Sequence, residues 1–431
     1  MSNMMNKAQG FGLSLITKIA GSEVLDQLKL RKFVEKSLYQ GSKTGFKVLN
    51  KTQKAFKPQA IDKQRLPNQV NKNLFDLSLT EEQQMTVDAM SQFAEEVLYA
   101  LAHDADHQAQ FPEQLWQHLV DLGLNYYALP EALGGVAAEQ NIVSNILIAE
   151  SLAKGDFSLT AGLLSTFSVI NAITRWGSTQ VQSMYLPVFA EDTDVTATFA
   201  FQEATPAFNP YQLKTTATEA NGQFYITGEK TLVILGDTAD VFLVSAELNG
   251  QPDIFVVQSN ETIAIKANPA MGLKAAETAT LHFNQTPALR LGDADFDYTA
   301  FVDLGNLMWC AMAIGTGEAI KAYCIKYANE RTAFGEPISH RQSVAFMIAD
   351  MAIEIDAMRM LVLNAASLAE AGQPFHREAY LARLLCAEKS MKIGTDGVQI
   401  LGGHGFTKEH PVERWYRDLR ATAILHSGLH A

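Results

Sequence analysis

Two stretches of this 431-residue chain combine arginine or glycine with turn-forming residues in a way that suits a phosphate-bearing ligand. The first, NERTAFGEPISHRQ, follows a long helix-like segment and contains Arg331, Arg341 and Gln342. Arginine contacts a phosphate group through two parallel hydrogen bonds. The second, GVQILGGHGF, places Gly402 and Gly403 after an apolar run, where glycine lets the backbone approach a ligand closely. An ordinary helix end and connecting turn explain either stretch equally well.

His426, in the stretch RWYRDLRATAILHSGLHA, is a third candidate for chemistry. A free imidazole has a pKa of about 6.5, and histidine is the most frequent general base in enzymes. A single histidine in such a place is more often structural or solvated than catalytic. These residue types therefore suit a bound phosphate ligand and ordinary turns equally, and they do not decide whether His426 accepts a proton.

The elements that must position these residues follow an α, β, α order. Residues 76–190 show helical apolar spacing, beginning with a capping-box pattern at Thr80 and a glutamine three residues later. Residues 194–292 contain short β-branched or aromatic runs, among them QFYITG and TLVILG, which predict a small antiparallel sheet or barrel. Helical spacing then returns over residues 302–329, 341–372 and 376–400.

Composition narrows the class of protein. Hydrophobic residues make up 47% of the chain, enough for a large core divided among two or three domains. The net charge of −13 argues against a nucleic-acid-binding protein. Cys310, Cys324 and Cys386 lie scattered in apolar segments, which indicates core packing in a reducing compartment such as the cytoplasm. We expect no membrane-spanning helix, because no run reaches the roughly 18 apolar residues required.

Residues 1–60 differ from the rest in charge, with eleven Lys or Arg against three Asp or Glu. Apolar residues recur loosely at helical spacing among these cations. A basic amphipathic helix of this kind can lie on an anionic membrane surface, here the inner membrane face. The alternative is a solvated helix, packed on its own protein or part of a flexible arm.

Six stretches in a fixed order carry a resemblance to a known family: LTEEQQ, LGLNYYALPEALGG, MGLKAAETATLHF, RTAFG followed by RQ, GVQILGGHGF and HPVERWYRDLR. In this order, over about residues 76–428, the chain resembles the acyl-CoA dehydrogenases of fatty-acid oxidation. The resemblance implies an α+β fold with three domains after a basic arm. We expect the arm at residues 1–75, a helical domain at 76–192, an antiparallel β domain at 193–294 and a second helical domain at 295–431.

The resemblance implies FAD as cofactor and a homo-oligomer, because the FAD site of this family is shared between subunits. The residues that match the family's positions for the pyrophosphate and adenine are Arg331, Phe334, Gln342, Gln399, Gly402 and Gly403.

The positions that match the family's flavin-ring contacts depart from its pattern. Gln202 stands where the family has a threonine that donates to the flavin, and Phe208 replaces a serine near the CoA. The family's W-I-T/S motif becomes Leu232, Val233 and Ile234, so the hydroxyl opposite flavin N5 is missing. Losing such a hydrogen bond costs about 0.5–1.5 kcal/mol.

The position of the catalytic base departs as well. The family's commonest base position falls on His426, and its alternative position falls on Gly305. Three interpretations remain open: His426 is the base, Asp303 reaches the site, or the protein binds FAD or acyl-CoA without dehydrogenating it. Asp303 and Asn306 also match positions near the CoA, which makes them substrate-binding candidates with Phe208.

The activity that the resemblance implies is oxidation of acyl-CoA to trans-2-enoyl-CoA, with electrons passed to an electron-transfer flavoprotein. A scaffold that binds FAD or acyl-CoA is the second hypothesis, and a nucleic-acid-binding relative that uses the basic arm is a third. Family members continue past the base position with a further helix that seals the flavin and CoA region. Because this sequence stops at Ala431, we expect a shortened C-terminal domain.

Overall fold

The computed structural model describes residues 78–135, 141–191 and 195–431. The basic helix predicted within residues 1–60 lies outside them.

A helical domain comes first, and it begins at the predicted capping box. The Gln83 backbone N–H donates to Thr80 Oγ1 at 3.1 Å, and the Thr80 backbone N–H donates to Gln83 Oε1 at 3.1 Å. Gly123, with a φ of +66°, ends a helix as predicted. The elements are α4 (Glu81–Phe93), the π-helical η1 (Ala94–Leu98), α5 (Tyr99–Gln108), α6 (Gln114–Leu122), α7 (Ile142–Leu152), α8 (Phe157–Trp176) and α9 (Thr179–Glu191).

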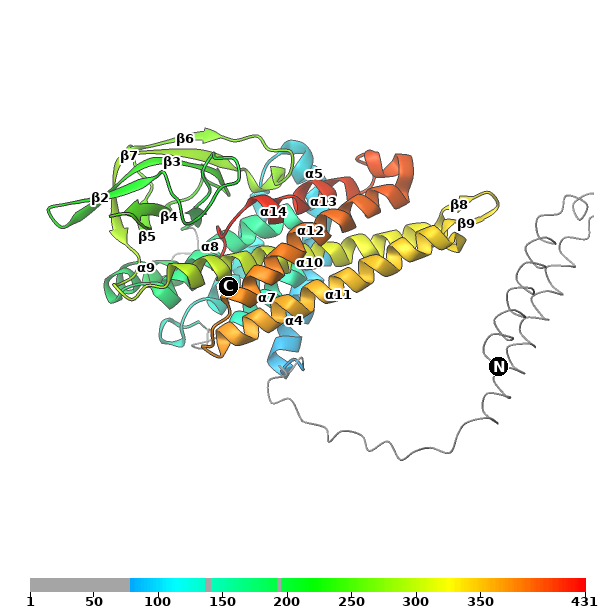
Figure 1. Cartoon of the computed structure of the whole chain (residues 1–431), viewed down its shortest axis with the longest axis horizontal. Coiled ribbons are helices and arrows are strands. Elements are labelled where there is room, and N and C mark those ends of the chain that lie inside the picture. The colour runs from blue at the N-terminus through cyan, green and yellow to red at the C-terminus, as the bar shows by residue number, and fades with distance from the viewer. Residues whose placement is uncertain (1–77, 136–140, 192–194) are drawn as a thin grey trace, which may run out of the picture. The chain divides into compact units, whose positions relative to one another are not determined.

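The middle of the chain forms the predicted barrel-like sheet (Figure 1). Its strands follow the order β1, β4, β2, β3, β7, β5, with β6 on β7, and β4 also pairs with β5. The strands are β1 (Ala197–Ala200), β2 (Thr216–Ala220), β3 (Gln223–Val233), β4 (Val241–Leu248), β5 (Gln251–Gln258), β6 (Ile263–Ala267) and β7 (Ala279–Arg290).

Three details of this sheet differ from the prediction. The runs QFYITG and TLVILG belong to one strand, β3, which crosses two register shifts against β7 and ends at Val233. Strand β2 was not predicted, because Ala217 is its only buried residue and its apolar signal is weak. Both β1 and β2 pair with β4 in parallel, so the sheet is mixed.

The C-terminal part is built on three long helices close to the predicted segments: α10 (Tyr298–Glu330), α11 (Gln342–Glu370) and α12 (His376–Leu401). A short hairpin of β8 (Thr332–Ala333) and β9 (Glu336–Pro337) joins α10 to α11 at the far end of the bundle (Figure 1). The turn η6 (Gly402–Phe406) and helices α13 (Val412–Leu419) and α14 (Ala421–Ile424) follow. The three cysteines are buried and free, which confirms their packing role.

The expectation that no apolar segment is long enough to span a membrane is wrong for helix α8. It is long and apolar enough to cross a membrane, and 94% of its most apolar window is buried inside the fold. This burial is the arrangement of a core helix.

Helix α13 joins the domains through buried polar contacts. Arg414 Nε donates to Asp156 Oδ2 at 2.8 Å, and Asp156 also caps α8. Arg417 Nη2 donates to Asp106 Oδ2 of α5 at 2.8 Å. Asp418 Oδ1 accepts from a backbone N–H of the loop after β6 at 2.7 Å. One short helix therefore touches the first helical domain and the β domain together.

We predict that Arg414→Met lowers the free energy of unfolding by roughly 3–5 kcal/mol, because it leaves the Asp156 carboxyl group buried without its cation. Urea unfolding followed by circular dichroism measures the change. The control is Arg377→Met, at an arginine whose side chain is 79% exposed, which should change stability by less than about 0.5 kcal/mol. Equal effects of the two substitutions would contradict the role given to the Arg414 pair.

Candidate functional site

The arginine turn and the glycine turn lie together at one end of the C-terminal helices. Tyr327, one helical turn before Arg331, connects them. Its Oη donates to the Leu401 carbonyl at 3.4 Å and lies 2.8 Å from His404 Nδ1. The two stretches that the sequence singled out are therefore brought together within one chain.

The surface around these two turns is open. The Phe334 side chain is 96% exposed, and a Cβ atom at Gly402 or Gly403 would meet no atom within 4 Å. Arg341 is exposed as well, and its guanidinium is paired with Glu336 at 3.0 Å. The predicted residues of this end that are exposed are Arg331, Phe334, Gln342, Gln399, Gly402 and Gly403.

The predicted flavin-ring positions lie near the other end of α10, beside the β domain. Gln202, Leu232 and Ile234 line a small cavity together with Trp309 and His426. This cavity has a volume of about 10 Å³, which is room for roughly one water molecule. The positions are thus brought together as predicted, but the space between them is filled.

A buried ion pair adjoins this cavity through Phe201, a lining residue whose carbonyl accepts from Lys230 Nζ at 3.2 Å. Lys230 Nζ donates to Glu203 Oε1 at 2.8 Å and to Ser245 Oγ at 2.9 Å. Burial lowers the pKa of Lys230 to about 8, although the Glu203 carboxylate opposes this change. Glu203 also accepts the backbone N–H groups of Lys214 and Thr215, so the pair fixes the loop that carries Gln202.

The substrate-binding candidates are engaged within the chain. Asp303 Oδ2 lies 2.6 Å from His376 Nδ1, and burial raises the pKa of Asp303 to about 6 against the opposing effect of His376. Asn306 Oδ1 accepts from Arg383 Nη1 at 3.2 Å. Phe208 is buried, and its ring packs on His426 with 6.1 Å between ring centres.

Neither predicted base position holds a strong base. Burial, reinforced by the nearby Arg383 cation, lowers the pKa of His426 to about 4, so its imidazole is neutral at pH 7 and weakly basic. Gly305 faces the backbone at Ser427 and Leu429. Asp303 is more basic than an ordinary carboxylate, but it is held by His376.

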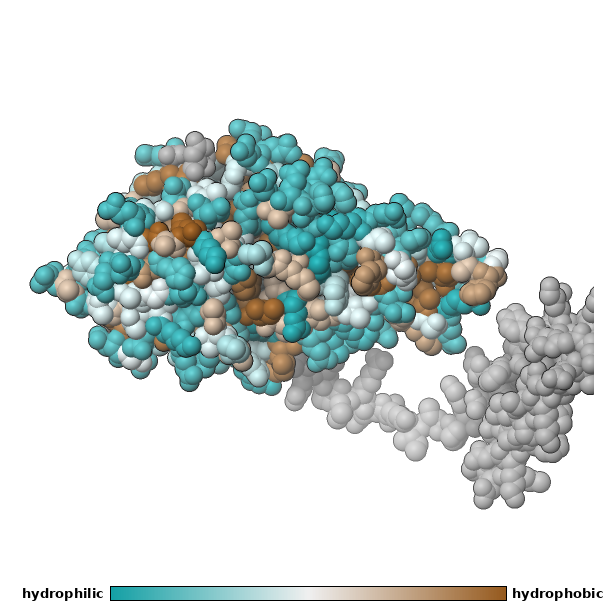
Figure 2. Space-filling view, turned by 90° about the horizontal axis from the view of Figure 1, so that it is seen from above, coloured by the Kyte–Doolittle hydropathy of each residue, from teal (hydrophilic) through white to brown (hydrophobic). Residues whose placement is uncertain are grey.

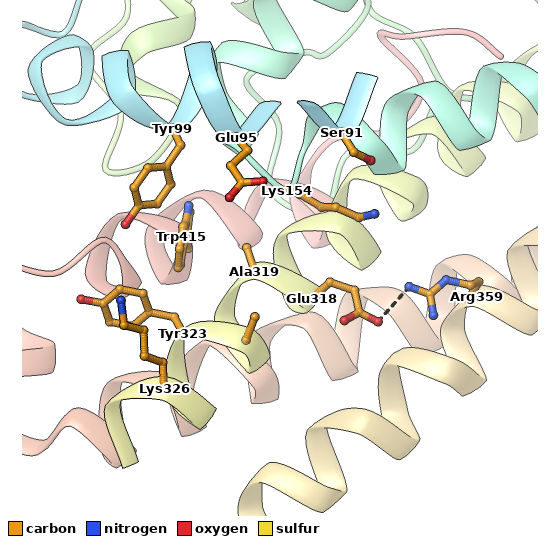
Figure 3. Close-up of a pocket in the computed structure, with 11 residues that line it drawn as sticks. Ser91, Glu95, Tyr99, Lys154, Glu318, Ala319, Tyr323, Lys326, Arg359 and Trp415 are labelled. Carbon is orange, nitrogen blue, oxygen red and sulfur yellow. Dashed lines mark hydrogen bonds and ion pairs between the residues drawn. The ribbon is translucent and has the colours of Figure 1, made fainter. Parts of the chain in front are cut away.

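A larger cavity of about 610 Å³ lies between the first helices and helices α10, α11 and α13 (Figure 3). The aromatic side chains of Tyr99, Tyr323 and Trp415 line one part of it, and the ion pair between Arg359 and Glu318, at 3.0 Å, lies at another. None of the residues predicted for cofactor or substrate lines this cavity.

Three family models match the chain in order. The acyl-CoA dehydrogenase N-terminal domain matches residues 80–193, the middle domain residues 198–286 and the C-terminal domain residues 299–428. The chain belongs to the acyl-CoA dehydrogenase family. These matches confirm the family resemblance found in the sequence, and with it the predicted α+β fold.

The curated relatives of this acyl-CoA dehydrogenase family member are named for different acyl groups. An acyl-CoA dehydrogenase of Bacillus subtilis is 31% identical over 81% of this chain and 95% of the relative. A short-chain-specific enzyme of Megasphaera elsdenii is 30% identical with the same coverage. A benzylmalonyl-CoA dehydrogenase of Aromatoleum aromaticum is 29% identical. Membership therefore supports an oxidoreductase and leaves the acyl group undetermined.

Solved structures give the same family. Butyryl-CoA dehydrogenase from Megasphaera elsdenii has a TM-score of 0.74 at 28% identity, covering 81% of this chain and 95% of that one. The FAD complex of PigA has a TM-score of 0.74 at 21% identity, which shows the shared fold alone. Proteins of this family are flavoproteins, and FAD is the cofactor that membership implies.

The two halves of an FAD molecule fit this chain differently. The open arginine and glycine turns suit a diphosphate and an adenine, since backbone and guanidinium donors are exposed there. The ring half does not fit the cavity of about 10 Å³. The adenylate half therefore fits, and the isoalloxazine half does not fit the conformation that the structure shows.

Sequence reasoning missed several residues of the ring side: Trp309, Arg383, His376 and the pair Lys230–Glu203. A single cation inside an apolar run was the available signal for Lys230 in TGEKTLV and for Arg383 in YLARLLC. Their partners, Glu203 and Asn306, are 27 and 77 residues away in the sequence. The pattern can therefore indicate a buried cation but cannot identify the residue that pairs with it.

We predict that His426 stays neutral down to about pH 4, which NMR titration of its ring protons would measure. Because its folded pKa lies below the unfolded value of about 6.5, the unfolded chain binds more protons between these values. The contribution of His426 to stability is then complete above pH 6.5 and is lost as the pH falls towards 4. His426→Gln should remove this part of the pH dependence, and an unchanged profile would contradict it.

Proposed function

We propose that this protein is an FAD-dependent oxidoreductase that acts on an acyl-CoA thioester in fatty-acid β-oxidation, in the cytoplasm, with an electron-transfer flavoprotein as acceptor. Family membership and the open adenylate end support this proposal. When bound, FAD would accept a hydride from the β-carbon of the acyl group. Arg331, Gln342, Gln399 and the glycine pair would hold its diphosphate and adenine. Contact of residues 1–60 with a membrane surface remains part of the proposal.

The convergence of the arginine and glycine turns through Tyr327 is the observation that carries this function. These turns lie far from the ring positions along the same helix. Arg331, which directly follows α10, comes 22 positions after Trp309 of the ring cavity, and this corresponds to roughly 33 Å of helix. An extended dinucleotide does not span that distance, so one FAD that contacts both groups must lie between two copies of the chain.

An apolar face on α11 supports such an assembly. Phe346, Ile353 and Met360 follow one another at seven-residue spacing, and 58%, 66% and 46% of these side chains are exposed. Seven-residue spacing places them on one side of the helix, as at helix–helix interfaces. Figure 2 shows apolar side chains gathered at the end of the molecule that carries β8 and β9. We propose a homo-oligomer that covers this face.

The absorption spectrum of the purified protein tests the function. We expect a yellow protein after reconstitution with FAD, and bleaching when butyryl-, octanoyl- or palmitoyl-CoA is added without oxygen. The acyl-CoA that bleaches the spectrum fastest indicates the preferred chain length. If the protein takes up FAD but none of these thioesters bleaches it, the proposed dehydrogenation is refuted and the FAD assignment stands.

We predict that Arg331→Gln weakens FAD binding by about tenfold or more, because a charge-assisted contact to phosphate contributes about 1.5–3 kcal/mol. Equilibrium titration with FAD measures the dissociation constant. Arg377→Gln removes the same charge from an exposed arginine at the opposite end of the bundle and should leave it unchanged. If both substitutions weaken binding alike, the effect is one of net charge and the assigned contact is wrong.

A second candidate is a relative that binds FAD or acyl-CoA without turning it over. The filled ring cavity and the weakly basic His426 favour it. We predict that His426→Glu raises the rate of α-proton exchange on bound butyryl-CoA, since a buried carboxylate is a stronger base than this imidazole. Exchange into D₂O followed by mass spectrometry measures it. A fall in exchange with both His426→Glu and His426→Ala would instead identify His426 as the base.

A further inference from the structure

The ring cavity is closed by one segment of the chain itself, Leu425–Ala431, which we call the closing segment. We infer that this segment occupies the place of the flavin ring, so that the protein binds the adenylate end of a nucleotide and admits the ring only when the segment leaves. This inference rests on the adenylate site of the proposed function.

Two side chains of α10 hold the backbone of the closing segment. The Ser427 N–H donates to Asn306 Oδ1 at 3.1 Å, and Trp309 Nε1 donates to the Ser427 carbonyl at 2.5 Å. Asn306 and Trp309 are three residues apart and lie on one face of the helix. The residue that sequence reasoning assigned to the substrate thus binds a peptide group of its own chain.

The far end of the segment lies between α8 and α10. Trp176 Nε1, at the end of α8, donates to His430 Nε2 at 2.9 Å. The His430 ring packs on Phe301 of α10 with 5.0 Å between ring centres, and His430 and Leu429 are fully buried. This end therefore extends away from the ring cavity into the seam between the two helices.

The closed site keeps polar atoms without partners. Among the residues that the structure describes, Gln202 Oε1 and Ser427 Oγ are buried without a hydrogen bond. Ser427 also has a φ of +50°, an uncommon value for a residue with a side chain. Displacing the segment would therefore break no side-chain hydrogen bond of Ser427 and would release an uncommon backbone conformation.

Gly305 is what makes room for the closing segment. A Cβ atom at this position would lie 2.4 Å from Ser427 Oγ and 2.6 Å from the Leu429 carbonyl oxygen. Any side chain at position 305 therefore competes with the segment for the same space. Gly317 of the same helix is a matched control, because the atoms nearest to its added Cβ belong to Ile355 and Ile393, at ordinary contact distances of 3.4 Å and more.

Gly305→Ala tests the inference. In the unchanged protein we expect ADP and FAD to bind with dissociation constants that agree within about threefold, because the ring contributes nothing while the segment is in place. Gly305→Ala should tighten FAD binding by about tenfold or more and leave ADP binding unchanged, since the apparent affinity rises with the fraction of open molecules. Gly317→Ala should change neither.

Hydrogen exchange of the Ser427 amide, which is bonded to Asn306, gives a readout that needs no nucleotide. It should exchange faster in Gly305→Ala than in Gly317→Ala. If Gly305→Ala does not fold, Trp176→Phe replaces it, because it removes the bond to His430 without adding volume. Its control is Trp116→Phe, in a helix away from the segment.

Two results would overturn the inference. The first is FAD binding that is at least about tenfold tighter than ADP binding in the unchanged protein. The second is a Ser427 amide that exchanges no faster in Gly305→Ala or Trp176→Phe than in the matched control. If neither ADP nor FAD binds any variant, the proposed function fails, and the exchange comparison alone then decides whether the segment is displaceable.

Discussion

The burial of α10 determines the geometry of the whole site. Every residue from Phe301 to Gly317 is buried, and the helix packs against α7, α8, α11 and α12. A helix that is packed on all sides in this way cannot bend or shift easily. Asn306 and Trp309 near one end and Tyr327 near the other are therefore held at a constant separation. The two groups of predicted cofactor residues therefore lie towards opposite ends of this helix.

Much of the fold was accessible from the sequence because its signals are local. The capping box at Thr80, the glycine that ends α6 and the spacing of α10, α11 and α12 each involve residues within a few positions of one another. Strand β2 was missed because its apolar alternation is weak. The open turns were accessible for the same reason, since RTAFG and GGHGF keep the family's spacing.

The closed half of the site was not accessible, because it depends on contacts between distant segments. Ser427 meets Asn306 across 121 residues, and His430 meets Trp176 across 254. The sequence showed that Gln202, Leu232 and Ile234 depart from the family, but it did not show that the chain itself fills the space. Arg383 illustrates the same limit. Its effect on the His426 pKa follows from how α12 packs beside the site.

The position of α13 along the chain has a consequence for biosynthesis. Its Arg414 and Arg417 supply the partners of Asp156 and Asp106, which precede them by 258 and 311 residues. A ribosome releases those carboxylates long before it releases α13, and domains generally fold in the order of their synthesis. Asp156 and Asp106 therefore have no Arg414 or Arg417 to pair with until residues 412–419 have been translated. The bridge that α13 makes between the first helical domain and the β domain can form only after these residues have left the ribosome.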